Sequence, residues 1–243
     1  WCARHGARVR VWDSREAPPQ APALTLAAPA ATRFSGTLDT ASLQGVQLVL
    51  KSPGLAPHDE RIAALLAAAR AQGIAVQGEL DLFTHALDEL RHERDYAPRL
   101  IAITGTNGKT TTAALTALLV ERCGKRVALA GNIGPTMLDT LAAALDAVGD
   151  DGAPLPLPQV WVLELSSFQL DGARDFQPAA ATVLNVTQDH LDWHGSIEAY
   201  AAAKARVFGE RAVMVINRDD TRVEAMVPAP VPARAGRARS APG

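Results

Sequence analysis

Cysteine, net charge and long apolar runs are all in short supply in this chain. Cys2 and Cys123 do not form the closely spaced pairs that zinc sites and redox-active thiols use, so a reduced, cytoplasmic setting is the default expectation. A formal net charge of −2 over 243 residues gives no reason to expect nucleic acid or an anionic membrane as a partner. No apolar run approaches the ~18 residues that a membrane-spanning helix requires.

What is present is an ordinary globular composition. The chain is 48% hydrophobic and 21% charged, and its length suits one large or two ordinary domains. We expect a piece of a longer protein, because the sequence starts at Trp1 within the pattern of a helix end and finishes in a Pro/Ala/Arg-rich tail (228–243) without a closing element. A charged stretch that ends in Pro98 marks a domain boundary, which divides the rest into domains 1–93 and 94–227.

Strand and helix patterns alternate along both domains, which predicts parallel sheets covered by helices in an α/β fold. The segment 17–36 gives little periodic signal. The predicted strands cover residues 8–12, 45–50, 74–76, 100–103, 125–130, 160–165, 180–186 and 212–217. The predicted helices cover residues 59–72, 79–90, 109–120, 136–148 and 196–208.

The stretch 100–112 carries the strongest functional signal, a strand followed by a glycine-containing turn and a helix. The two glycines of the turn let backbone N–H groups approach a polyphosphate, and the helix adds its free N-terminal donors. Lys109 can reach the β- and γ-phosphates, and the Thr110 hydroxyl can ligate Mg²⁺. Ile103 stands where the usual pattern has its first glycine, so a purely structural turn is the alternative. The residues predicted to bind ATP are Gly105, Thr106, Asn107, Gly108, Lys109, Thr110 and Thr111.

Three further residues are candidates for chemistry. Glu164 lies within an apolar strand pattern, where a carboxylate is either satisfied by a turn or an arginine, or ligates Mg²⁺ beside the phosphates. His190 and His194 lie in a stretch without cysteine, so we reject zinc; His190 suits a second Mg²⁺ or the phosphates, and His194 suits turn structure. Lys204 is one of only four lysines among 24 basic residues, which suggests a position where an amine is needed, but on this count alone a solvated helix lysine is the stronger interpretation.

Asp13 follows the first strand, at the edge where open parallel sheets bind ligands. A contact with a ribose and a simple turn cap both remain open for this residue.

Together these residues resemble the Mur ligase family. The resemblance rests on segments 104–111, 131–134, 164–170 and 185–192, with Lys204 on its helix and Ser-Pro-Gly at 52–54 in the first domain. The phosphate loop and the Asp-His-Leu-Asp sequence look like the wider family, which includes folylpolyglutamate synthases. The Glu-Leu-Ser-Ser-Phe-Gln-Leu sequence and the Rossmann-like first domain look like the branch that adds D-glutamate.

The resemblance implies a Rossmann-like N-terminal domain that holds a UDP-linked substrate and whose first strand precedes Trp1. It also implies a P-loop-type central ATPase domain, with a C-terminal amino-acid-binding domain beyond Gly243. The implied activity is an ATP-dependent ligation of D-glutamate to UDP-N-acetylmuramoyl-L-alanine through an acyl phosphate, in peptidoglycan precursor synthesis. We expect a cytoplasmic monomer with no nucleic-acid or membrane partner, and we expect the piece alone to be inactive.

The resemblance also implies roles for individual residues. Lys109, His190 and Lys204 are catalytic, with Lys204 carbamylated. The implied ligands of two Mg²⁺ ions are Thr110, Glu164, His190 and Lys204. The implied substrate-binding residues are Asp13, Ser14, Arg15, Ser52, Gly54, Asn132, Ser166 and Gln169.

Two alternatives remain at this point. A folylpolyglutamate-synthase-like ligase would use the same acyl-phosphate chemistry, but the Rossmann-like first domain argues against it. A non-catalytic nucleotide-binding module would need no second metal or carbamate, so the joint retention of Lys109, Glu164, His190 and Lys204 argues against it.

Overall fold

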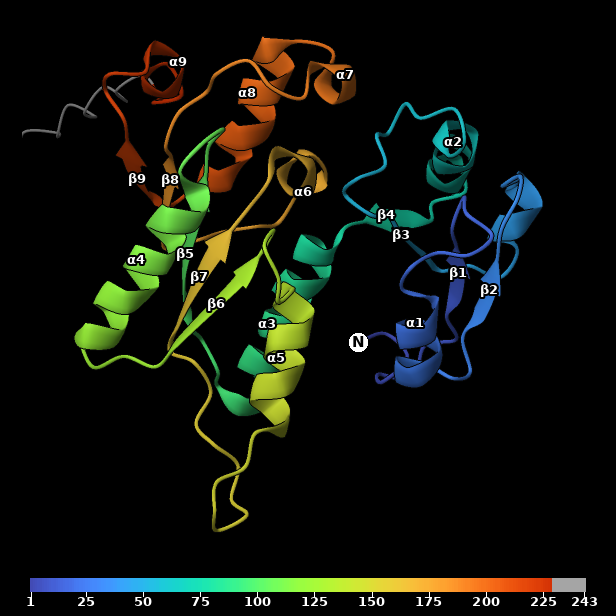
Figure 1. The fold of residues 1–243 in the computed structure, drawn as a ribbon, viewed down its shortest axis with the longest axis horizontal. Coiled ribbons are helices and arrows are strands. Elements are labelled where there is room, and N and C mark those ends of the chain that lie inside the picture. The colour runs from blue at the N-terminus through green and yellow to red at the C-terminus, as the bar shows by residue number, and fades with distance from the viewer. Residues whose placement is uncertain (229–243) are drawn as a thin grey trace, which may run out of the picture.

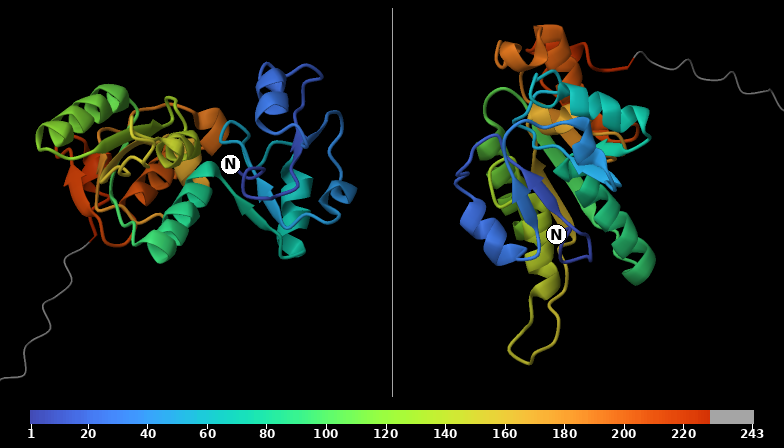
Figure 2. Two further views of the ribbon diagram at one scale, coloured as in Figure 1. Left: turned by 90° about the horizontal axis from the view of Figure 1, so that it is seen from below. Right: turned by 90° about the vertical axis from the view of Figure 1, so that its right-hand side faces the viewer.

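The computed structural model describes residues 1–228, so the predicted tail (228–243) lies outside the described residues apart from Pro228. The described chain forms two α/β units side by side, a small N-terminal one and a larger one built on a five-stranded sheet (Figures 1 and 2). All pairings between the named strands are parallel, which confirms the predicted fold class. Among the described helices, none is long and apolar enough to cross a membrane.

The small unit contains four short strands in two separate parallel pairs, β1 with β2 and β3 with β4. Its elements are β1 (Arg10–Trp12), α1 (Ala21–Ala27), β2 (Thr32–Phe34), η1 (Thr40–Leu43), β3 (Leu48–Leu50), α2 (Ala63–Ala71) and β4 (Ala75–Gln77). The apolar face of α2 builds the core of this unit. That core consists of Leu43, Ile62, Leu65, Leu66 and Ala69.

Several elements of the small unit differ from the sequence prediction. Residues 1–7 form turns instead of a helix end, and α1 and β2 arise in the segment that gave little periodic signal. The helix predicted from residue 59 begins at Ala63, because the Asp59 carboxylate accepts the N–H of Arg61 at 3.0 Å and pairs with its guanidinium at 2.6 Å. These contacts stabilise a turn before the helix.

Helix α3 (Glu79–Arg94) follows β4 directly but packs its apolar face into the core of the larger unit. Leu80, Phe83 and Leu87 belong to the same buried cluster as Trp161 of the large sheet. The predicted boundary after residue 93 therefore separates this helix from the core in which it is buried. By packing, we propose that the boundary lies at Gly78, where β4 ends and α3 begins.

The large sheet has the strand order β6-β7-β5-β8-β9. Its strands are β5 (Arg99–Thr104), β6 (Val127–Gly131), β7 (Val160–Glu164), β8 (Ala180–Val183) and β9 (Val213–Ile216). Every residue of β7 is buried, as expected for an apolar strand in the middle of a doubly covered parallel sheet. In register, Ile103 of β5 lies opposite Glu164 of β7, so the two strands end at the same edge.

Helices cover the two faces of this sheet unequally (Figure 1). One face packs against α4 (Lys109–Arg122). The other face packs against α3, α5 (Met137–Asp146), α6 (Ser167–Gly172) and α8 (Ile197–Ala205). The remaining elements are α7 (Leu191–His194), η2 (Arg206–Phe208) and α9 (Thr221–Glu224). On the edge strand β9, Met214 and Ile216 pack into the large core, whereas Val213 and Val215 are 66% and 57% exposed.

Candidate active site

The predicted phosphate loop (residues 104–109) joins β5 to α4 at the carboxyl edge of the sheet. Gly105 has φ +153°, and a Cβ there would lie 3.0 Å from the Cβ of Leu184, so a side chain would push the loop off its neighbour. The Lys109 ammonium folds back onto the loop and donates to the carbonyl oxygens of Gly105 and Thr106, each at 2.9 Å. Helix α4 begins at Lys109, so its first N–H groups face the same loop.

Glu164 lies at the end of β7, beside the start of α4. Its side chain is 3% exposed, and the Thr110 hydroxyl donates to Oε2 at 3.1 Å while the Asn132 amide donates to Oε1 at 3.3 Å. Within the described residues Glu164 has no ion-pair partner. A buried carboxyl group that contacts only neutral donors leaves its oxygens available to a divalent cation, which prefers oxygen ligands.

Lys204 is the second lysine of the site and is 1% exposed. It extends from α8 and donates to the Gly105 carbonyl oxygen at 2.8 Å, so both candidate lysines share one acceptor. Burial, reinforced by the positive charge of Lys109, lowers the pKa of Lys204 to about 7. A substantial fraction of its amine is therefore neutral, and nucleophilic, at neutral pH.

Tyr200 connects these groups, although the sequence analysis assigned it no role. Its hydroxyl lies 3.2 Å from the Thr106 hydroxyl, and the Lys204 ammonium lies 4.5 Å from the centroid of its ring. The signal was available, because Tyr200 precedes Lys204 by four residues and shares its helix face. Burial raises the pKa of Tyr200, which keeps its hydroxyl protonated as a donor or acceptor.

His190 lies next to this group within an aromatic cluster. Its ring centroid is 4.7 Å from that of Phe168 and 6.2 Å from that of Tyr200, and its Nε2 is 3.4 Å from Asp189. His190 has a left-handed backbone (φ +51°) and immediately precedes the short helix α7. His194 donates to or accepts from the Ser167 hydroxyl at 3.0 Å, which is consistent with the expected structural role.

Ser166 and Gln169 form a capping box at the start of α6. The Ser166 hydroxyl accepts the N–H of Gln169 at 3.3 Å, and Gln169 Oε1 accepts the N–H of Ser166 at 3.0 Å. Both side chains thus have a structural partner just after Glu164, and their role in substrate binding stays a prediction.

The remaining predicted substrate residues belong to the small unit. Asp13 pairs with Arg15 at 2.8 Å, which lowers the pKa of Asp13 to about 2, and the Ser14 hydroxyl accepts from Arg61 at 3.2 Å. Ser52 and Gly54 lie in the turn after β3. Lys51 of the same turn reaches the large unit, with its ammonium 5.5 Å from the centroid of the Trp193 ring. The turn and the candidate site are thereby joined through α7.

The described residues contain no group of three or more His, Cys, Asp and Glu side chains arranged to hold a metal ion. Thr110 and Glu164 are in contact, whereas Lys204 and His190 each lie beside the ring of Tyr200. This arrangement suits Mg²⁺, which takes only one or two protein carboxylates and fills its other positions with phosphates and water.

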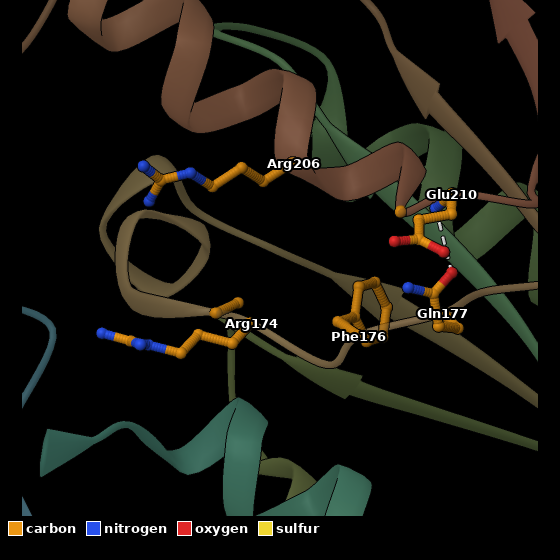
Figure 3. A pocket seen from close by; sticks show the side chains of 7 residues that line it. Arg174, Phe176, Gln177, Arg206 and Glu210 are labelled. Atoms are coloured by element: carbon orange, nitrogen blue, oxygen red, sulfur yellow. Dashed lines mark hydrogen bonds between the residues drawn. The ribbon is translucent and has the colours of Figure 1, made fainter. Parts of the chain in front are cut away.

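A separate pocket of about 260 Å³ lies near the start of β8. Figure 3 shows side chains that line it. Arg174, Phe176, Gln177, Arg206 and Glu210 contribute to its lining. Gln177 precedes β8, whereas the phosphate loop lies beyond the carboxyl ends of the strands, so this pocket is not part of the candidate site.

A parallel sheet whose carboxyl edge presents a glycine turn, a Lys-Thr helix start and a buried carboxylate is the arrangement typical of P-loop nucleotide-binding domains. Residues 103–231 match the family described as "Mur ligase middle domain", and residues 1–78 match "Mur ligase MurD-like, N-terminal domain". The chain belongs to the Mur ligase family.

Named relatives agree with this membership. The chain is 57% identical over 233 residues to a UDP-N-acetylmuramoylalanine–D-glutamate ligase of Albidiferax ferrireducens, which covers 95% of this chain and 44% of the relative. It is 56% identical over 239 residues to the ligase of that name from Burkholderia thailandensis, covering 98% and 46%. The chain thus spans less than half the length of these relatives. A solved UDP-N-acetylmuramoyl-L-alanyl-D-glutamate–2,6-diaminopimelate ligase is 28% identical, with a TM-score of 0.48, covering 82% of this chain and 46% of that one.

Proposed function

We propose that this chain forms the nucleotide-binding part and the UDP-substrate part of an ATP-dependent ligase that joins D-glutamate to UDP-N-acetylmuramoyl-L-alanine. The proposal rests above all on one observation: Lys109 and Lys204 converge on the Gly105 carbonyl, next to the contact between Thr110 and the buried Glu164. The identity to D-glutamate ligases supports the choice of substrates.

The reaction begins when the terminal carboxylate of the UDP-linked substrate attacks the γ-phosphate of ATP. An acyl phosphate forms and ADP leaves; the amine of D-glutamate then displaces phosphate and forms the amide. Both partners of the first step are anions, so the protein must neutralise charge and align the reactants. Lys109 would leave the Gly105 and Thr106 carbonyls for the phosphates, and the N–H groups at the start of α4 would hold the same anion.

Thr110 and Glu164 would hold one Mg²⁺, and His190 with a carbamylated Lys204 would hold a second. Bound Mg²⁺ would neutralise phosphate charge during the transfer. Carbamylation joins the neutral Lys204 amine to the carbon of CO₂ and releases one proton, which leaves an anionic carbamate. The lowered pKa of Lys204, about 7, supports this step, because a protonated amine has no free electron pair.

The small unit would hold the UDP end of the substrate through Asp13, Ser14, Arg15, Ser52 and Gly54. Asn132, Ser166 and Gln169 would contact the end nearer the reacting carboxylate. We further propose that the enzyme acts in the cytoplasm as a monomer, without a nucleic-acid or membrane partner, and that this chain alone does not turn over.

The test uses two proteins, the 243-residue chain and a version extended to the length of its relatives. We expect the printed chain to bind Mg·ATP in calorimetry. We expect the extended chain to release phosphate only when UDP-N-acetylmuramoyl-L-alanine and D-glutamate are both present. Release that follows a folate-type acid instead, or ATP binding without any substrate-dependent turnover, would overturn the proposal. After incubation with ¹³C-bicarbonate, a carbamate signal in NMR that disappears in Lys204→Met would establish the modification.

A further inference from the structure

The segment 184–187, which follows β8, runs along the phosphate loop and bonds to it through its backbone. The Leu184 N–H donates to the Thr104 carbonyl at 2.9 Å, and the Thr106 N–H donates to the Asn185 carbonyl at 3.0 Å. The Thr187 N–H then donates to the Thr106 hydroxyl at 3.1 Å. The phosphate loop is therefore held along its length by hydrogen bonds to this segment.

Asn185 adds a two-way contact through its side chain. Its Oδ1 accepts the backbone N–H of Asn107 at 2.9 Å, and its Nδ2 donates to the Asn107 carbonyl at 3.1 Å. One carboxamide thus holds both peptide groups that flank the Asn107 Cα. Gly108 and Lys109, where α4 begins, follow immediately, so the orientation of Asn107 sets the direction of the donors that an anion would meet.

The segment is itself held from its far side by residues near β9. The Asn217 side chain donates to the Leu184 carbonyl at 3.0 Å, and the Asp220 carboxylate accepts the Val186 N–H at 2.7 Å. Because Asp220 also caps α9, the segment is fixed between two ordered elements. Asn185 therefore contacts the loop from a fixed support.

We propose that Asn185 is a positioning residue for nucleotide binding, which orders the phosphate loop before the nucleotide arrives. A loop that is already ordered loses less conformational entropy on binding, and this gain appears as affinity. The inference rests on the proposed nucleotide-binding function of the loop. Asn185 itself acts through Asn107 and touches no reacting atom.

The variant Asn185→Ala removes both side-chain bonds to Asn107. We expect the affinity of the chain for Mg·ATP to fall about ten- to a hundredfold, from two lost hydrogen bonds and a loop that must order on binding. Gln177→Ala is the matched control. The Gln177 carboxamide lies before β8, at its opposite end, and accepts the Glu210 N–H at 2.9 Å (Figure 3). The Gln177→Ala substitution removes a similar hydrogen bond between two segments but leaves the phosphate loop intact.

Both variants and the unaltered chain are compared in calorimetry with Mg·ATP, with affinity expressed per folded molecule. Hydrogen exchange of the peptide covering 104–109 is measured without nucleotide. The expected result is weaker binding and faster loop exchange in Asn185→Ala, and neither change in Gln177→Ala. In the extended chain, KM for ATP should rise in Asn185→Ala while KM for D-glutamate stays constant.

Unchanged affinity in Asn185→Ala, while the unaltered chain binds Mg·ATP, would overturn the inference and leave the proposed function standing. Equal losses in both variants, with lowered thermal stability, would also overturn it, because the role would then be structural. An unaltered chain that binds no Mg·ATP would overturn the proposed function and this inference together.

Discussion

Lys109 and Lys204 donate to the same atom, the carbonyl oxygen of Gly105, at 2.9 and 2.8 Å. Two ammonium groups on one neutral acceptor repel each other, and the charge of Lys109 contributes to the lowered pKa of Lys204. Both side chains therefore end at the turn where a polyphosphate would lie. When no anion is bound, the two side chains donate hydrogen bonds to carbonyl groups of the loop itself.

Replacing Lys109 by methionine keeps the length and the apolar stem of the side chain but removes the charge. We expect affinity for Mg·ATP to fall about ten- to a hundredfold, the effect of losing a charged hydrogen-bond donor. Calorimetry on the 243-residue chain measures the affinity. The exposed Lys125 just before β6 offers the same substitution as a control, and Lys125→Met should bind as the unaltered chain does. Equal affinity in both variants would contradict the placement of the phosphates.

Replacing Glu164 by glutamine keeps the shape and an oxygen acceptor for the Thr110 hydroxyl, but removes a buried charge. Without ligand, the melting temperature should stay the same or rise, since an uncompensated buried carboxylate is costly. With ADP present, the added stabilisation produced by Mg²⁺ should disappear. Thermal melts with and without Mg²⁺ test this against the exposed Glu198→Gln. A variant that is destabilised and still responds to Mg²⁺ would exclude Glu164 as a ligand.

His194 predicts a pH dependence of stability. Burial lowers its pKa below the ordinary 6.5, an effect that Asp171 opposes and that Lys204, His190 and Arg206 reinforce. Between the lowered pKa and 6.5 the unfolded chain binds more protons, so this histidine's contribution is complete above about 6.5 and is lost as the pH falls.

His194→Gln should therefore lose less melting temperature than the unaltered chain between pH 7.5 and pH 5.5. The exposed His92→Gln should show the same loss as the unaltered chain. If the melting temperatures of His194→Gln and the unaltered chain fell equally with pH, protonation of His194 would not destabilise the fold, and the prediction would be wrong.

Gly131 tests the packing at the edge of the site. A Cβ there would lie 2.1 Å from the Glu164 carbonyl oxygen, in a backbone with φ +127°. Gly131→Ala should lower the free energy of unfolding by about 3 kcal/mol or more, because backbone must move. Gly172→Ala, where a Cβ meets nothing within 4 Å, should have little effect. Chemical denaturation of both variants gives the comparison, and similar values would mean that β6 and β7 separate easily.

The phosphate loop was predictable from sequence because all its parts are consecutive. The contact of Asn185 with Asn107 was not, since 78 residues separate them and only the strand order places β8 beside β5. Ser166 and Gln169 have the i, i+3 spacing of a capping box. Their structural contact can therefore be predicted from the local sequence alone.

The missed elements of the small unit have a physical explanation. Helix α1 has no buried residue and β2 is mostly exposed, so neither has an apolar face to impose a periodic pattern. The apolar stripe of α3 was visible, but a stripe does not reveal which of two sheets it covers. The fold class was therefore predictable, whereas the assignment of α3 required the structure.

The edge strand β9 is the feature of the described chain from which we would expect aggregation in concentrated solution. Its outer backbone donors and acceptors have no neighbouring strand among the described residues, and Val213 and Val215 expose apolar surface beside them. Such an edge can accept a strand from another molecule, so at high concentration we expect this chain to aggregate by edge-to-edge pairing of strands. A charged residue at position 215 would break that template without entering the core, and would yield a better sample for every measurement above.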